Sequence, residues 1–93
     1  MDKARIAVLV SGGGTNLQAL LDAQMKGILK SGQICLVISN NPNAYALERA
    51  KNAGVESKVV TKKEVGSQNA FELKIIDLLE EKQIDSIVLA GFM

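Results

Sequence analysis

The chain has 93 residues, of which 47% are hydrophobic, with 11 Lys and Arg against 10 Asp and Glu. This length allows one domain at most, and the near balance of charge argues against a broad basic surface for nucleic acid or a membrane. Histidine is absent and Cys35 is the only cysteine, which excludes the usual zinc ligand sets and a Ser–His or Cys–His nucleophile pair.

The first predicted strand, Ile6 to Val10, is a continuous apolar run. Such a run is typical of a strand buried on both faces of a parallel sheet. Its five or six apolar residues are too few for a signal-peptide core or a membrane span. We therefore expect a cytoplasmic protein that has no membrane partner.

A glycine-rich loop, Ser-Gly-Gly-Gly-Thr-Asn at residues 11–16, follows this strand. Thr15 is predicted to begin a helix, and Gln18 stands three residues later, as in a capping box. Gly27 or the Ser31–Gly32 pair is expected to end the helix. Its apolar residues recur at helical spacing and comprise Leu17, Leu20, Leu21 and Ile28, with Met25 close to the same face.

The rest of the chain alternates strands with helices. Strands are predicted at 34–38, 55–60 and 84–89, and strand 55–60 is expected to be the most exposed of the three. Cys35, in strand 34–38, is interpreted as a buried core thiol. A helix over about 44–53 is expected to be capped by Asn43 and ended by Gly54. Ser67 is expected to cap the last helix, whose apolar face contains Phe71, Ile75, Leu78 and Leu79.

This alternation predicts right-handed crossovers and an α/β fold, a Rossmann-like parallel sheet with helices on both faces. Residues 1–93 would then form the first half of one domain, because the chain stops four residues after its last predicted strand. We expect either a separate second half or self-association through the exposed edge of strand 84–89.

The glycine loop is the strongest functional signal. Ligands of open parallel sheets bind beyond the carboxyl ends of the strands, where a glycine loop and a helix N-terminus can hold a phosphate. One glycine would serve a plain turn, and three favour phosphate binding. A P-loop would need Gly-Lys-Ser/Thr, and a dinucleotide fingerprint would need a glycine at Leu17 and an acidic residue within 39–41. The pattern therefore favours a phosphomonoester.

A weaker signal lies at the end of the last predicted strand. Residues 89–93, Leu-Ala-Gly-Phe-Met, stand at the same sheet edge as the glycine loop. Phe92 and Met93 are either ordinary core residues or the wall of a pocket for a flat apolar ligand.

At these residues the chain resembles a known family. Residues 8–20, Val-Leu-Val-Ser-Gly-Gly-Gly-Thr-Asn-Leu-Gln-Ala-Leu, are similar to the opening of glycinamide ribonucleotide formyltransferases. Three later segments agree in order and spacing: 37–40, 46–50 with 53–54, and 88–93. The resemblance covers the whole chain but about half of a family member. Formyltetrahydrofolate hydrolases and methionyl-tRNA formyltransferases are less similar, because they usually carry other residues in place of the triple glycine.

The resemblance implies two sets of site residues. Gly13, Gly14, Thr15 and Asn16 would bind the phosphate of glycinamide ribonucleotide. Leu89 and Phe92 would line the pocket for the pteridine of 10-formyltetrahydrofolate, the formyl donor, and the backbone at Met93 would contact it. Gln68 stands where the family often has a folate-binding arginine. No metal is implied.

The implied activity is formyl transfer from that folate to the amine of glycinamide ribonucleotide in de novo purine biosynthesis. The family's catalytic Asn-x-His-Pro-Ser segment and aspartate come later in its sequence, so this chain is expected to hold no catalytic residue and to be inactive alone. An alternative stays open, namely a non-catalytic phosphate- or nucleotide-binding regulatory module.

Overall fold

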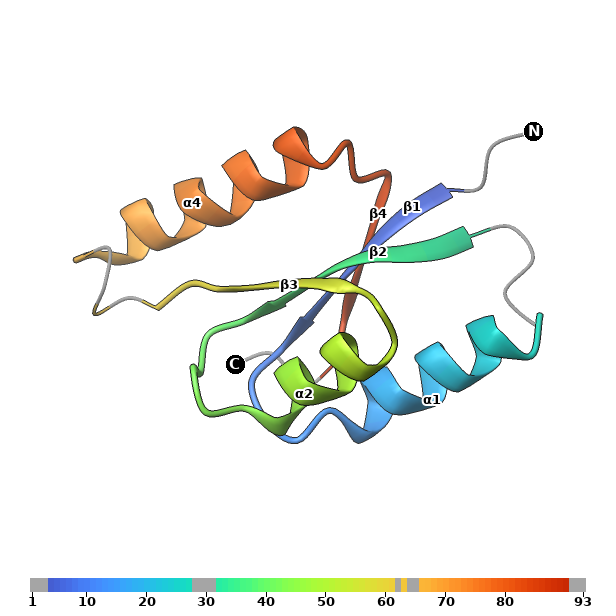
Figure 1. Ribbon diagram of the computed structural model, residues 1–93. Coiled ribbons are helices and arrows are strands. Elements are labelled where there is room, and N and C mark those ends of the chain that lie inside the picture. The colour runs from blue at the N-terminus through green and yellow to red at the C-terminus, as the bar shows by residue number, and fades with distance from the viewer. Residues whose placement is uncertain (1–3, 28–31, 62, 64–65, 91–93) are drawn as a thin grey trace.

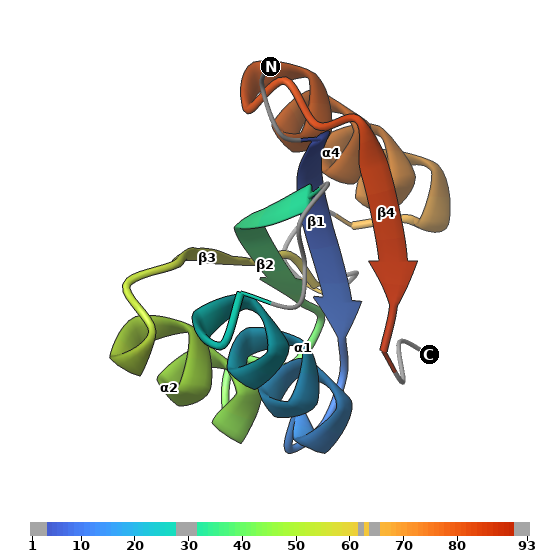
Figure 2. The same cartoon turned by 90° about the vertical axis from the view of Figure 1, so that its right-hand side faces the viewer.

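The computed structural model describes residues 4–27, 32–61, 63 and 66–90. Its four strands form one parallel sheet in the order β3-β2-β1-β4, so that β1 lies at the centre. Helices α1 and α2 cover one face of the sheet and α4 covers the other (Figures 1 and 2). The predicted α/β fold is therefore confirmed. In chain order the elements are β1 Ala4–Val10, α1 Thr15–Met25, β2 Gly32–Ser39, α2 Tyr45–Asn52, β3 Glu56–Val59, α4 Gln68–Glu81 and β4 Ser86–Leu89.

Strand β1 is apolar on both sides because a helical layer covers each face. Val8 and Val10 belong to one buried cluster, together with Leu17 and Leu21 of α1. Ala7 and Leu9 alternate with these valines along β1 and point the other way, into a second cluster formed with α4. That second cluster contains Ala7, Leu9, Leu36, Ile38, Val60, Phe71, Ile75 and Leu78.

Cys35 occupies an irregularity between the two central strands. Ile6 pairs with Ile34, but the next residue, Ala7, pairs with Leu36, so Cys35 is the extra residue of a β-bulge. The bulge breaks the alternation of faces, because Ile34 joins the α1–α2 cluster and Leu36 the α4 cluster. The prediction that Cys35 lies in the core is wrong, because this thiol is only half-buried.

Helix α1 begins at Thr15 as predicted, but without the capping box. Its N-cap is Gly14, and no side chain caps the helix. The Gln18 side chain instead donates to Asp22 Oδ1 at 2.9 Å. Met25 is also misplaced by the prediction, because it is 79% exposed.

Of the other predicted helix ends, those at Gly27, Gly54 and Ser67 agree with the structure, and the cap of α2 does not. Gly27 adopts a φ of 76° just after α1, whereas Ile28 and Ser31 lie outside the described residues. Helix α2 is capped by Ala44 and not by Asn43, whose backbone N–H donates to Asn41 Oδ1 in the preceding turn. Gly54 follows α2 with a φ of 73°. The predicted cap of α4 is confirmed, because Ser67 Oγ accepts from the N–H of Ala70 at 3.1 Å.

Arg5 joins the start of β4 to the central strand. Its backbone N–H donates to Asp85 Oδ2 at 2.8 Å, and its carbonyl accepts from the Asp85 N–H at 2.8 Å. Its Nε also donates to the Lys82 carbonyl at 2.8 Å. Regular pairing with β1 then starts at Ser86, two residues later than predicted.

On the outer strand β3, the Glu56 carboxylate lies 3.0 Å from Lys82 Nζ and 3.7 Å from Lys58 Nζ. The hydrogen bond from Lys82 is the largest cause that lowers the pKa of Glu56 below its ordinary value. A lowered carboxyl pKa stabilises the folded state above the unfolded pKa, and this stabilisation is lost as the pH falls through the folded value.

We therefore expect Glu56→Gln to lower the thermal midpoint slightly near neutral pH, and to leave it unchanged in acid, where both proteins are uncharged at this position. The effect is small because the pair is exposed to solvent. Thermal melts recorded from neutral pH down into acid measure this change in midpoint, with Glu81→Gln on α4 as the matched control. A difference that persists in acid would contradict the assignment to the Glu56 charge.

Candidate functional site

The candidate site lies where the parallel strands end. Because β1 and β4 run in the same direction, their carboxyl ends meet at one edge of the sheet (Figure 2). The glycine loop leaves β1 at this edge and leads directly into α1. This is the edge at which open α/β sheets bind ligands.

Gly14 is required by both its conformation and its surroundings. Its φ of 79° and ψ of 32° lie in the left-handed region that side chains disfavour. A Cβ at this position would also lie 2.7 Å from Ala46 Cβ and 3.0 Å from Ala46 Cα. Gly14 thus lets the loop pack against the backbone of α2, where Ala46 is fully buried.

Gly12 and Gly13 serve a different purpose. Both are exposed, and a Cβ at either position would meet no atom within 4 Å. Packing within the chain therefore does not require glycine at these two positions. Their backbone is open to a ligand that approaches from solvent.

The start of α1 supplies hydrogen-bond donors next to this open backbone. The helix's first internal bond runs from the Gln18 N–H to the Gly14 carbonyl at 2.8 Å, so the N–H groups before Gln18 precede the helical ladder. Thr15 and Asn16 are exposed, and the first turn of α1 contains no acidic residue. The positive end of the helix dipole therefore faces no internal carboxylate in that turn.

Arg49 of α2 contacts the loop, a role that sequence reasoning missed. Its Nε donates to the Gly13 carbonyl at 2.7 Å, and its Nη1 donates to Gln18 Oε1 at 3.1 Å. Its guanidinium carbon lies 4.8 Å from the centre of the Tyr45 ring. The four-residue spacing of Tyr45 and Arg49 predicts that these two side chains meet on one helix. It does not predict that Arg49 contacts the glycine loop.

The end of β2 closes the same edge with polar groups. Ser39 is fully buried, and its Oγ donates to the Asn41 carbonyl and accepts from the Asn41 N–H, both at 3.0 Å. These bonds hold the turn that leads toward α2. The turn carries no carboxylate at the place where a dinucleotide site would need one.

The residues predicted to contact folate are only partly described. Leu89 is 68% exposed at the end of β4, and Gln68 begins α4, where its Nε2 donates to Glu72 Oε1 at 3.0 Å. Phe92 and Met93 lie outside the described residues. Gln68 lines an apolar hollow between α4 and β4. Leu89 is not among the described lining residues, and it follows the lining residue Ile87 of β4 by two positions. The lining comprises Gln68, Phe71, Glu72, Ile75, Ile76, Leu79 and Ile87.

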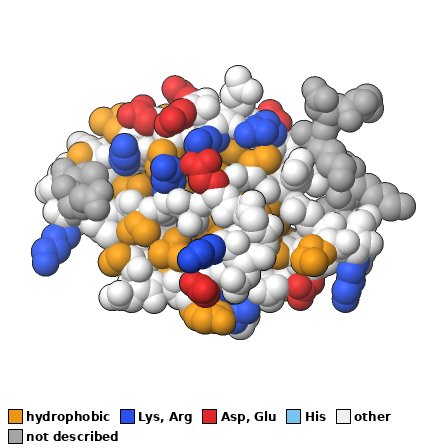
Figure 3. Space-filling model, viewed as in Figure 1, with side chains coloured by type: hydrophobic (Ala, Val, Ile, Leu, Met, Phe, Trp, Pro, Cys, Tyr) orange, Lys and Arg blue, Asp and Glu red, His pale blue; other side chains and the backbone are white. Residues whose placement is uncertain are grey.

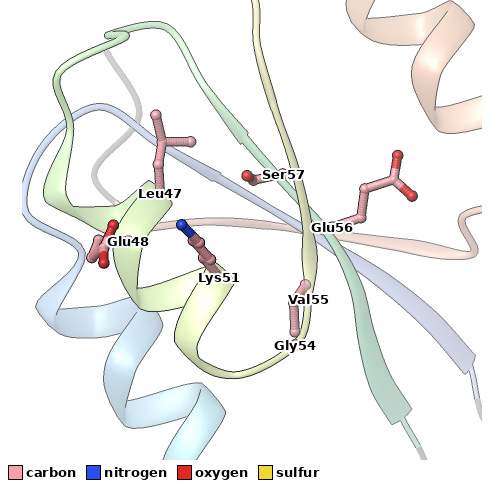
Figure 4. Close-up of a pocket in the computed structure, with 7 residues that line it drawn as sticks. All are labelled: Leu47, Glu48, Lys51, Gly54, Val55, Glu56 and Ser57. Carbon is pink, nitrogen blue, oxygen red and sulfur yellow. The ribbon is translucent and has the colours of Figure 1, made fainter.

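A further hollow of about 550 Å³ opens beside α2 and β3 (Figure 4). Its charged lining residues have opposite signs, with Glu48 and Lys51 on α2 and Glu56 on β3. None of the glycine-loop residues lines it. It therefore does not extend the candidate site.

Charged side chains of both signs lie on the described surface outside the candidate site. On the face shown in Figure 3, basic and acidic side chains are interspersed. Within the described ranges, no three His, Cys, Asp or Glu side chains gather as metal ligands would. No helix of the described chain is long and apolar enough to span a membrane.

The family profile described as formyl transferase matches residues 4–93. The chain belongs to the formyl transferase family. This confirms the resemblance drawn from the glycine loop and the later segments. Among characterised relatives, the phosphoribosylglycinamide formyltransferase of Haemophilus influenzae is 43% identical over 89 residues, which cover 96% of this chain and 42% of that protein.

Solved structures extend the comparison to the fold of this formyl transferase chain. The glycinamide ribonucleotide transformylase 1 of Geobacillus kaustophilus superposes with a TM-score of 0.94 at 40% identity, covering 99% of this chain and 48% of that one. The corresponding protein of Symbiobacterium toebii gives 0.92 at 41% identity, covering 98% and 42%. The chain thus spans less than half the length of these relatives and matches their N-terminal part.

The packing at Gly14 leads to a stability prediction. We expect Gly14→Ala to lower the free energy of unfolding by about 2 kcal/mol or more, because it adds left-handed strain and a clash with the α2 backbone. Gly13→Ala is the matched control, because its Cβ enters open space. Denaturant unfolding of the two variants measures the difference. Equal losses of stability would show that the close approach of Gly14 to Ala46 is unimportant.

Proposed function

We propose that this chain binds the phosphate of glycinamide ribonucleotide at its glycine loop. It does so as the nucleotide-binding half of an enzyme that transfers a formyl group from 10-formyltetrahydrofolate to the amine of that nucleotide, in de novo purine biosynthesis. The observation that carries the proposal is the exposed backbone at Gly13 ahead of α1. Support comes from relatives named phosphoribosylglycinamide formyltransferase.

The loop offers a phosphomonoester three kinds of donor. The N–H groups at the start of α1 point along the helix axis toward an anion. The Thr15 hydroxyl and the Asn16 amide are both exposed beside them and can donate to phosphate oxygens. The helix dipole adds a favourable potential for negative charge. Gly13, Gly14, Thr15 and Asn16 are therefore the proposed phosphate ligands.

Binding the phosphate places the reactive end of the substrate. The amine must attack the formyl carbon, and the tetrahedral intermediate then needs stabilisation of its oxyanion and transfer of a proton. An anchored phosphate supplies binding energy far from the reacting atoms and limits the motion of the amine. Because this chain contains no histidine, we assign it the binding role and expect no formyl transfer by the chain alone.

We place the folate beyond the end of β4. Leu89 exposes its side chain there, and Phe92 and Met93 follow it in the sequence. Gln68 is neutral and shares a hydrogen bond with Glu72. It would therefore offer folate an amide contact and not the charge of an arginine. The compartment we propose is the cytoplasm, where the free thiol of Cys35 stays reduced.

The outer edge of β4 is the proposed contact for the second half of the enzyme. Within the described sheet β4 pairs with β1 alone, and Ile87 and Leu89 are 50% and 68% exposed. This exposed apolar surface extends to the hollow beside α4, which Ile87 lines together with the exposed Ile76. An unpaired apolar edge readily takes up another strand. In a preparation of this chain alone, a second copy would fill that place.

Phosphate binding is tested with a pair of isosteric substitutions. We expect Asn16→Asp to weaken binding of phosphate and of glycinamide ribonucleotide by about tenfold, because it places a carboxylate beside the anion. The same change stabilises the helix N-terminus, so the fold is preserved. Titration followed by amide-resolved NMR measures the affinity, and the largest shifts are expected at residues 13–16.

Asn43→Asp is the matched control, because Asn43 is also exposed and lies close to the start of a helix, α2. It is expected to bind phosphate as the natural chain does. Shifts centred away from residues 13–16, or equal losses in both variants, would contradict the loop assignment.

The β4 edge is tested by sedimentation. The natural chain is expected to self-associate at micromolar concentration, and Ile87→Lys to shift it toward monomer, because a charged residue disfavours edge pairing. Lys74→Glu, on the exposed side of α4, is the control for altered charge. A natural chain that sediments as a sharply melting monomer would contradict this use of the edge.

A further inference from the structure

Arg49 commits its planar guanidinium to the backbone of the glycine loop. The Nε bond to the Gly13 carbonyl is short, at 2.7 Å, as expected of a bond from a charged donor. The guanidinium is itself immobilised by the Nη1 bond to Gln18 and by the Tyr45 ring beneath it. Gln18 is in turn bonded to Asp22. Four side chains from α1 and α2 are thus connected, and Arg49 links them to the Gly13 carbonyl.

The orientation of that carbonyl decides the orientation of the next N–H. In a trans peptide, the carbonyl of one residue and the N–H of the following residue point in opposite directions. No peptide bond among the described residues is cis. While Arg49 holds the Gly13 carbonyl against α2, the Gly14 N–H therefore points away from α2.

Without the bond from Arg49, the intrinsic preferences of this peptide would not oppose its turning over. It joins two glycines, which lack the Cβ that restricts backbone rotation in other residues. A Cβ at Gly13 would meet no atom within 4 Å, so the Gly13 end of the peptide is open, although Gly14 is packed against Ala46. After such a flip, the loop would present a carbonyl oxygen to the anion in place of a donor. A fixed orientation matters because an electrostatic site acts best when its dipoles are already aligned.

We infer that Arg49 is a positioning residue for the phosphate loop, fixing the Gly13–Gly14 peptide with its N–H turned toward the ligand. That the ligand is a phosphate group rests on the proposed function. Lysine cannot replace Arg49 fully, because an ammonium is a point charge without the fork that reaches both Gly13 and Gln18. The role therefore depends on geometry as well as on charge.

The first measurement is phosphate affinity. Arg49→Met keeps the aliphatic stem but removes the donors, and we expect it to weaken inorganic phosphate binding about tenfold or more. Arg49→Lys keeps the charge, and we expect it to bind several-fold more weakly than the natural chain. Lys51→Met removes the same charge from an exposed position of α2, and it should stay within about twofold. Equal affinity of Arg49→Met and the natural chain would overturn the inference.

The second measurement does not depend on phosphate. Residual dipolar couplings of the Gly14 N–H in phosphate-free protein report the orientation of the peptide. We expect them to change in Arg49→Met and Arg49→Lys while the couplings of α4 stay constant. Unchanged Gly14 couplings in both variants, or natural affinity in Arg49→Lys, would overturn the positioning role. If the natural chain binds no phosphate but the Gly14 couplings change, the proposed function fails and the positioning of the loop stands.

Discussion

The close approach of Gly14 to Ala46 is the constraint on which the candidate site depends. It requires a residue without a Cβ on the loop and a small residue on α2, and both are present. The left-handed conformation of Gly14 then turns the chain from β1 into α1 without a side-chain cap. Because loop and helix touch at this point, Arg49, one turn after Ala46, lies close enough to bond the Gly13 carbonyl.

The three glycines therefore divide two tasks between them. Gly14 is used by the fold, and its replacement would disturb packing before it disturbed any ligand. Gly12 and Gly13 leave backbone exposed to solvent, which is the arrangement that an incoming anion needs. A loop that is anchored at one end and open at the other can present fixed donors without filling the site with its own side chains.

The sheet brings the glycine loop and the end of β4, the proposed positions of the nucleotide and the formyl donor, to one edge. Strand β1 is buried on both faces and carries the glycine loop at its end, whereas β4, its neighbour, ends in the exposed Leu89. Parallel pairing brings these two ends together although they are far apart in the sequence. The same arrangement leaves the outer side of β4 unpaired within the described sheet, and this side is the proposed contact for a second half.

The sequence by itself determined the order of the elements, the parallel α/β class, the Ser67 cap and the place of the glycine loop between β1 and α1. Each of these rests on residues close together in the chain, whose periodicity and turn chemistry act locally. Tertiary structure decided the bulge that moves Cys35 out of the core, the exposure of Met25 and the use of Gln18 by Arg49 in place of a capping box. It also decided the contact between Arg49 and Gly13, which are 36 positions apart. No local pattern records such a contact, because it exists only after β1, α1 and α2 have packed together.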